Sequence, residues 1–492
     1  MLKRDFIQRM KRLLGDEYDA FEAALGNDAP VSIRINPRKF DLSQSHACKL
    51  CGENGVSIDG YKRDRPVVDI ADSEKVAWCE TGYYLSQRPS FSLDPLFHAG
   101  AYYVQEASSM FLEQAILTIL GQDTPLRHRG EVVHRRNRQL PPFEQSPLMA
   151  LDLCAAPGGK STHLSSLLPD GSLLVCNETI RSRSLILAEN MTKWGHTGTF
   201  ITQNDPKTFS RLPHLFDMIL ADLPCSGEGM FRKNPATRNE WSIENVRFCA
   251  ARQRRIIYDC WETLKPGGHL VYSTCTFNTE ENEENVKLLS TELGAEIVSI
   301  PTRPEWNITG SLCHDMPVYR FFPHRTHGEG FFLALMQKHH DQTHTAISKP
   351  GTRDMANVWR RHNAVERTIM TNAHVMSRTT AQSNPLNIKS VYAILSKHLN
   401  LITAGLTPGA RKGKDFTPSA ALALSVALTD GAFPAVDLPY EQAIAYLQRE
   451  AISLPAGTPK GHVLVTYRNT PLGFVKNIGI RANNLYPKAW RL

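Results

Sequence analysis

The chain has 492 residues, of which 41% are hydrophobic, so it is long enough for two to four domains with buried cores. No apolar run approaches the ~20 residues that span a bilayer, and the N-terminal segment lacks the long apolar stretch of a secretion signal. We therefore expect a monomeric cytoplasmic protein without membrane contact. The net charge of +7 and the isoelectric point near 8.8 mildly favour a polyanionic partner such as nucleic acid.

Ten cysteines are present, and in a cytoplasmic protein we expect them to stay reduced. Cys48 and Cys51 form a CxxC pair near His46, but without a second pair a closed zinc site lacks ligands, so no metal site is predicted. Five other cysteines stand in ordinary strand, helix or loop contexts and are interpreted as small structural residues: Cys79, Cys176, Cys249, Cys260 and Cys313.

One segment precedes the central domain of the chain and another interrupts it. Residues 1–95 combine an amphipathic N-terminal helix with short apolar runs, which predicts a small α/β accessory domain without visible chemistry. Residues 96–338 form the predicted central domain. Within them, residues 122–147 carry five arginines and little apolar periodicity, which predicts an exposed basic insertion. We favour a solvated loop there over a loop that contacts RNA phosphates.

From residue 148 onward, apolar strands alternate with helix-length segments. The strand sequences are MALDLC, SLLVCNE, GTFITQND, FDMILADLP and GGHLVYSTCTF. This alternation predicts a parallel sheet with helices on both faces, so the fold class is α/β. Three later apolar runs, AEIVSI, YRFFP and GEGFFLALMQK, are expected to add antiparallel strands. Ligands of such sheets bind at the carboxyl ends of the strands.

The stretch from Cys154 to Lys160, CAAPGGK, connects the first strand to a helix and permits three kinds of nucleotide site. A dinucleotide fingerprint needs three spaced glycines, and only Gly158 and Gly159 are present. A phosphate-binding P-loop is weakened because Cys154 replaces its first glycine. Adenosyl-methionine needs only a close-approach turn and an acidic residue after the next strand, where Glu178 stands. An ordinary strand-helix turn is the fourth alternative.

Two cysteines follow the fourth and fifth strands, which predicts that Cys225 and Cys275 face one cavity. A single such cysteine is more often a small buried residue, but two beside a possible methyl-donor turn favour chemistry. Methylation of carbon 5 of a pyrimidine requires a thiolate to add to carbon 6 and activate carbon 5. Asp222 is then a candidate for proton donation or hydrogen bonding at ring nitrogen 3. The residue types alone do not say which cysteine attacks.

The C-terminal part divides into a polar segment at 339–386, interpreted as a linker, and a predicted β-rich domain at 387–492. That domain is expected to hold two helices and a strand pair joined at 469–471. Its tail, RANNLYPKAWRL, mixes cations with aromatic residues. Such a tail suits RNA binding or burial in a small barrel about equally.

Four motifs in order, LDLCAAPGGKST, ADLPCSGEGMFRKNP, STCTFNTEENEENV and PHRTHGEGFFLA, resemble the Nop/Sun family of RNA cytosine-5 methyltransferases. The segments GFVKN and RANNLYP are similar to the bacterial RsmF branch of that family, which modifies small-subunit ribosomal RNA. The resemblance implies a Rossmann-like class I methyltransferase core, an N-terminal accessory domain and a PUA-like RNA-binding C-terminal domain. It also implies S-adenosyl-L-methionine as the cofactor and ribosomal RNA as the partner.

By this resemblance, Cys275 is the nucleophile and Cys225 assists breakdown of the covalent adduct. The implied cofactor contacts are Cys154, Ala155, Ala156, Pro157, Gly158, Gly159, Lys160, Glu178, Asp205 and Asp222. Two positions depart from the family pattern. Leu223 replaces a common alanine, and the sequence NDP around Asp205 replaces a pattern that ends in glycine, so Pro206 puts the Asp205 contact in doubt. The alternatives are the same chemistry on transfer RNA, or a non-catalytic ribosome-assembly factor.

Overall fold

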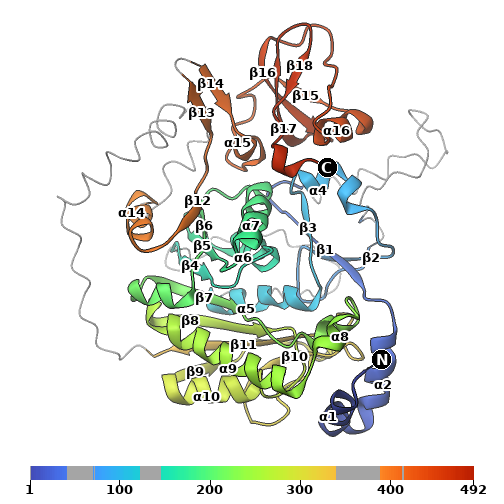
Figure 1. The fold of residues 1–492 in the computed structure, drawn as a ribbon, viewed down its shortest axis with the longest axis vertical. Coiled ribbons are helices and arrows are strands. Elements are labelled where there is room, and N and C mark those ends of the chain that lie inside the picture. The colour runs from blue at the N-terminus through green and yellow to red at the C-terminus, as the bar shows by residue number, and fades with distance from the viewer. Residues whose placement is uncertain (1, 41–69, 71–72, 122–145, 340–387, 413–414) are drawn as a thin grey trace.

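The computed structural model describes residues 2–40, 70, 73–121, 146–339, 388–412 and 415–492 (Figure 1). The predicted basic insertion at 122–147 and the predicted linker at 339–386 lie almost wholly outside the described residues, as do Cys48 and Cys51. Among the described residues, no helix combines the length and the apolar character needed to cross a membrane.

A nine-stranded sheet forms the centre of the molecule, in the order β10-β11-β8-β7-β4-β5-β6-β12, with β9 also paired to β11. The five strands predicted from the alternating pattern run parallel, and β9, β10 and β11 pair antiparallel at one side, as expected. Their bounds are β4 Met149–Asp152, β5 Leu173–Asn177, β6 Thr199–Thr202, β7 Phe216–Asp222, β8 Leu264–Thr274, β9 Ala295–Val298, β10 Tyr319–Phe321 and β11 Phe331–Lys338.

Helices cover both faces of this sheet, which is why its strands read as continuous apolar runs rather than as alternating ones. In β4, Ala150 faces the side of α5, α6 and α7, whereas Met149 and Leu151 face the side of α9, α10 and α14. The bounds are α5 Leu112–Ile119, α6 Gly159–Leu167, α7 Arg181–Trp194, α8 Thr237–Glu240, α9 Ile243–Cys260, α10 Glu283–Leu293 and α14 Ile388–His398.

The N-terminal part contacts two different regions. Helices α1 Arg4–Leu14 and α2 Tyr18–Gly26 pack on Phe231 and Trp241, which follow β7. Strand β1 Val31–Ile35 pairs with β2 Gly82–Leu85 on one side and with β3 Tyr102–Val104 on the other. In the chain, the short helix α4 Pro95–His98 lies between β2 and β3. Because β3 lies beyond residue 95, the N-terminal sheet extends past the predicted domain boundary.

The C-terminal part begins later than the sequence indicates. Strand β12 Leu401–Ala404 pairs antiparallel with β6, so the segment from α14 to β12 belongs to the central sheet rather than to the predicted domain at 387–492. The reason is hydrophobic: Leu395 and Leu399 are buried in the core of that sheet. The later elements are β13 Gly409–Lys412, β14 Asp415–Pro418, α15 Ala420–Leu424, β15 Ala435–Asp437, α16 Tyr440–Leu447, β16 Gly461–Tyr467, β17 Thr470–Asn477 and β18 Ala482–Asn484.

Strands β15 to β18 form a four-stranded sheet at one end of the molecule (Figure 1). Arg468 and Asn469 both have positive φ angles, 49° and 59°, as a two-residue hairpin turn requires. This sheet, α16 and the N-terminal sheet share one hydrophobic core, which includes Ile33, Tyr446 and Val465. The two outer regions of the chain therefore support each other.

Candidate functional site

Every site residue predicted from the sequence lies at the carboxyl ends of the parallel strands. The turn from Cys154 to Lys160 follows β4, Glu178 follows β5, and Asp205 follows β6. Asp222 ends β7, and Cys275 follows β8 directly. Parallel pairing brings these ends to one edge of the sheet, where an α/β protein binds its ligand.

The two glycines of the turn are required by its geometry. Gly158 has φ +115°, a conformation that residues with a side chain rarely adopt. At Gly159, a Cβ atom would lie 3.3 Å from the ring of Tyr103. Gly158 stands at the N-terminus of α6, so the backbone comes close to any ligand held there.

Asn177 ties the ends of three strands together, a role that the sequence analysis missed. Its Nδ2 donates to the carbonyl oxygens of Leu153 (3.2 Å) and Asn204 (3.0 Å), and its Oδ1 accepts from the hydroxyl of Thr202 (2.8 Å). The only signal in the sequence is a polar residue that ends an apolar run. This network fixes the spacing between the turn and the two acidic residues beside it.

Those two acidic residues make different contacts. The buried carboxylate of Glu178 accepts from the N–H of Ile180 (2.9 Å) and contacts Arg183 (3.3 Å), whose other Nη donates to the carbonyl of Ala156 (2.8 Å). Asp205 instead accepts from the N–H of Lys207 (3.0 Å) and caps a 3-10 helix. The proline after Asp205, a departure from the family pattern, is the first residue of that helix.

Lys160 and Asp222 form an ion pair of 2.9 Å between the turn and the end of β7. The other carboxylate oxygen of Asp222 accepts from the hydroxyl of Ser273 (2.8 Å). Burial lowers the pKa of Lys160, but the charge and the hydrogen bond of Asp222, with smaller contributions from Cys275 and Asp152, together outweigh burial and raise the pKa. The side chain is therefore a charged donor beside the cysteines.

The sulfur atoms of Cys225 and Cys275 are 3.2 Å apart, although the residues are fifty positions apart in the chain. Strands β7 and β8 are neighbours and align Asp222 with Ser273, which brings the two following loops together. Both thiols are partly accessible and free of disulfides. The hydrogen bond to Cys275 and burial raise the pKa of Cys225 well above its usual value, so Cys225 holds its proton.

Two buried carboxylates hold the loops that carry the cysteines. Glu228 accepts from the N–H groups of Phe277 (2.7 Å) and Asn278 (2.9 Å) and from the indole of Trp241 (2.8 Å). Glu281 accepts from the N–H of Ser226 (3.0 Å), and burial raises its pKa to about 7. The sequence analysis assigned no role to either one, although both stand within motifs that it quoted.

Asp152, at the end of β4, offers a buried acceptor toward the same turn. Its Oδ2 accepts from the hydroxyl of Ser161 (2.6 Å), whereas its Oδ1 has no hydrogen-bond partner. Burial raises its pKa to about 7. Asp152 therefore has an acceptor oxygen to offer, and it lies beside the glycine turn and the carboxylate of Glu178. These groups together suit a ligand that has a ribose and an ammonium group. S-adenosyl-L-methionine has both.

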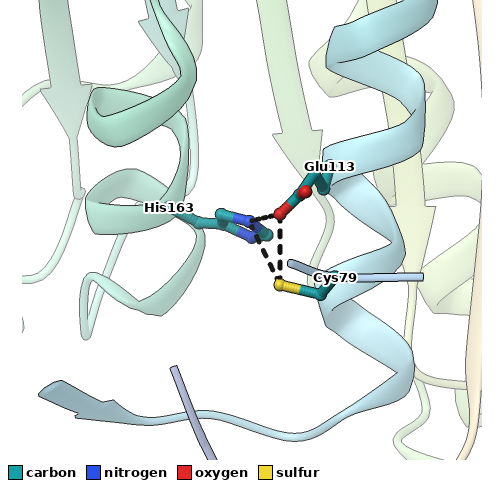
Figure 2. A group of neighbouring side chains, drawn as sticks. All are labelled: Cys79, Glu113 and His163. Atoms are coloured by element: carbon teal, nitrogen blue, oxygen red, sulfur yellow. Dashed lines mark hydrogen bonds and ion pairs between the residues drawn. The ribbon is translucent and has the colours of Figure 1, made fainter. Parts of the chain in front are cut away.

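A second cluster lies between α6, which carries His163, and α5, which carries Glu113 (Figure 2). Cys79, Glu113 and His163 place three potential metal ligands within 4.8 Å of one another, all buried. Glu113 accepts from Cys79 (3.2 Å) and His163 (3.3 Å). Burial raises the pKa of Glu113, but the hydrogen bonds and charge of His163, with the hydrogen bonds from Glu80 and Cys79, together lower it. Because these three side chains hydrogen-bond to one another, we interpret this cluster as a support between α5 and α6 rather than as a metal site.

Family models and curated relatives match most of the chain. Residues 140–337 match the family model of the 16S rRNA methyltransferase RsmB/F, residues 2–107 match that of the N-terminal domain of 16S rRNA methyltransferase RsmF, and residues 433–492 match that of the RsmF PUA domain. The ribosomal RNA small subunit methyltransferases F of Salmonella heidelberg and Salmonella typhi are each 27% identical over 98% of this chain and 95% of their own length.

Two solved structures from Pyrococcus horikoshii resemble the fold. A methyltransferase homologue has a TM-score of 0.51 and 24% identity, and covers 68% of this chain and 95% of its own. A structure of NSun6 has a TM-score of 0.51 and 19% identity, and covers 68% of this chain and 98% of its own. At these identities the likeness concerns the fold alone.

Proposed function

The chain belongs to the RsmB/RsmF family of 16S rRNA methyltransferases, and on that premise we propose that it methylates carbon 5 of a cytosine in small-subunit ribosomal RNA through a covalent cysteine adduct. The observation that carries the proposal is the pair of thiols, 3.2 Å apart, beside the Lys160–Asp222 ion pair. The proposal includes a monomer that acts in the cytoplasm.

In this proposal, the thiolate of Cys275 adds to carbon 6 of a flipped-out cytosine and makes carbon 5 nucleophilic. Lys160 donates a hydrogen bond to the ring as negative charge develops, and Asp222 orients both Lys160 and the base. After methylation, a base removes the proton from carbon 5, and the bond between carbon 6 and the sulfur of Cys275 breaks. Cys225, which holds its proton, donates a hydrogen bond to the departing thiolate of Cys275 and so stabilises it.

S-adenosyl-L-methionine, when bound, supplies an electrophilic methyl group on a sulfonium. The residues proposed to hold it are those of the turn, Cys154 to Lys160, with Glu178 and Asp222 beside it. Glu178 is proposed to accept from ribose hydroxyls, and the N-terminus of α6 to bring backbone close to the ligand. Asp205 is part of the proposed set. Its carboxylate accepts from the N–H of Lys207 and must bind the ligand at the same time.

Trapping the adduct tests the proposal. Cys225→Ala should accumulate a protein-RNA adduct that survives denaturing electrophoresis, because release is impaired. Cys275→Ala should form no adduct and transfer no methyl group. Cys313→Ala, an exposed cysteine outside the site, is the matched control and should behave like the wild type. Normal turnover in both site variants would overturn the assignment of roles.

The second candidate function is the same methylation on transfer RNA. The third is a non-catalytic role as a ribosome-assembly factor. Methyl transfer to protein-free 16S RNA, to small subunits and to transfer RNA, measured side by side, separates the first two. The paired thiols favour an enzyme over an assembly factor, because such a factor needs neither. Methylation of transfer RNA alone would overturn the ribosomal assignment and leave the chemistry in place.

A further inference from the structure

The residues that follow the two cysteines are joined by their hydroxyl groups. Ser226 follows Cys225, Thr276 follows Cys275, and the two hydroxyl oxygens are 2.9 Å apart. Both side chains are buried, so water competes little for this hydrogen bond. The two cysteine loops are therefore linked one residue away from each sulfur atom.

Asn278 completes this link. Its Nδ2 donates to the hydroxyl oxygens of Thr276 (2.9 Å) and Ser226 (3.3 Å), and its Oδ1 accepts from the N–H of Glu281 (2.9 Å). Glu281 in turn accepts from the N–H of Ser226 (3.0 Å), so Ser226 is held at both its backbone and its side chain. We call the group of three, Ser226, Thr276 and Asn278, the loop bridge.

The backbone of the Cys275 loop is also held by contacts that do not involve the two hydroxyls. The N–H of Gly229 donates to the carbonyl of Cys275 (2.9 Å). Glu228 accepts from the N–H groups of Phe277 and Asn278. Loss of a hydroxyl from the loop bridge should therefore leave the Cys275 loop in place.

The Cys225 loop depends on the loop bridge for its distance from Cys275. Nε2 of Gln253 donates to the carbonyl of Pro224 (3.1 Å), which attaches the Cys225 loop to α9. The bond to Glu281 attaches it to the segment before α10. The loop bridge instead attaches it to the residue next to Cys275, so it is the contact that sets the spacing of the two sulfurs.

We propose that the loop bridge positions Cys225 for release of the product, so that Ser226, Thr276 and Asn278 are positioning residues. The inference rests on the proposed function, because it takes Cys275 as the nucleophile. During release, the bond between carbon 6 and the sulfur of Cys275 breaks, and its electron pair stays on that sulfur. The hydrogen bond from Cys225 stabilises this charge only while the two sulfurs stay in contact, as they are at 3.2 Å.

Thr276→Val tests the proposal, because valine keeps the branched shape of threonine and lacks its hydroxyl. The full-length protein, S-adenosyl-L-methionine and protein-free 16S ribosomal RNA are mixed and quenched at successive times, and denaturing electrophoresis follows the protein-RNA adduct. The adduct should form within about twofold of the wild-type rate and decay about tenfold more slowly. The ratio kcat/KM should stay unchanged, because it reports the steps up to methyl transfer.

Three further variants separate positioning from a general loss of structure. Thr276→Ser returns a hydroxyl and should restore adduct decay to within about twofold of the wild type. Thr263→Val is the matched control: it removes another buried threonine hydroxyl, which donates to the carbonyl of Leu212, and should leave adduct decay unchanged. In the Cys225→Ala background, Thr276→Val should slow decay no further, because the loop bridge acts through that thiol.

Two results would overturn the proposal and leave the methylation chemistry in place. One is decay at the wild-type rate in Thr276→Val, or a further delay when that change is added to Cys225→Ala. The other is an equal delay in Thr276→Val and Thr263→Val, which would attribute the effect to a general loss of stability. If the wild type itself forms no adduct with ribosomal RNA, the proposed function fails, and the inference falls with it.

Discussion

Around the turn after β4, Glu178 and Asp205 contact backbone N–H groups and one half-exposed arginine, Arg183. Around the cysteines, Glu228 and Glu281 lie almost wholly inside the protein and accept hydrogen bonds from several buried donors. Glu178 and Asp205 make few contacts, and some of their partners are exposed to solvent, whereas Glu228 and Glu281 make many contacts inside the protein.

The difference follows from what each half must do under the proposed mechanism. A cofactor binds and leaves in every cycle, so the groups that hold it must exchange partners with water at low cost. Two thiols that act on one base must keep a fixed relation, because a displacement of about 1 Å costs roughly 100-fold in rate. Accessible contacts suit the first task, and a buried network suits the second.

The largest effect expected in the cysteine half is on chemistry. Cys275→Ala should lower methyl transfer at least about 1000-fold, because no other thiol replaces the nucleophile. Transfer of a tritiated methyl group to ribosomal RNA measures this loss, and calorimetry should show unchanged cofactor affinity. A variant that keeps more than a tenth of the activity would remove Cys275 from the role of nucleophile.

The next effect concerns stability. Glu228→Gln places an amide where a buried carboxylate accepts two backbone N–H groups, so we expect a loss of about 3 kcal/mol in the free energy of unfolding. Urea denaturation measures it. The exposed Glu240→Gln, on the neighbouring helix α8, should change stability little. Equal stability of the two variants would show that the network is not what holds the cysteine loops.

A smaller effect depends on pH and lies in the cofactor half. Burial raises the pKa of Asp152 to about 7, so the folded protein binds this proton more tightly than the unfolded chain, whose aspartates titrate near 4. The contribution to stability is therefore present at low pH and is lost as the pH rises from about 4 to about 7.

Asp152→Asn removes that titration. Relative to the wild type, its free energy of unfolding should rise by about 2 kcal/mol between pH 5 and pH 8. Urea denaturation at both pH values measures the change. Glu281, whose pKa burial also raises to about 7, is present in both proteins and cancels. Asp170→Asn, an exposed control, should show no such difference, and a parallel pH dependence of Asp152→Asn and the wild type contradicts the assignment.

The smallest effect tests the accessible contacts directly. Arg183→Ala should weaken S-adenosyl-L-methionine binding about threefold, because the half-exposed arginine orients Glu178 only modestly. Calorimetry measures the affinity, and Arg181→Ala, two residues away and exposed, is the control. A loss of a hundredfold or more would show that the cofactor half is as rigid as the cysteine half.

Much of the fold was predictable because it depends on local patterns. The five parallel strands, the antiparallel additions and a hairpin were expected from apolar runs and turn residues, and the structure confirms them, although the hairpin turn lies at 468–469 rather than at the predicted 469–471. The place of β12 was not predictable. The sequence placed its four residues in a separate C-terminal domain. In the structure they belong to the central sheet, because they pair with the edge strand β6.

The sequence by itself determined which segments form the central strands and which polar residues end them, because periodicity and motif spacing are properties of neighbours in the chain. It determined that Cys225 and Cys275 each follow a strand. Only the tertiary structure decided that their sulfurs are 3.2 Å apart, that Lys160 pairs with Asp222, and that Glu228 and Glu281 hold both loops. These contacts join residues far apart in sequence, and their distances depend on how β7 and β8 align and on which carboxylates are buried between the loops that follow them.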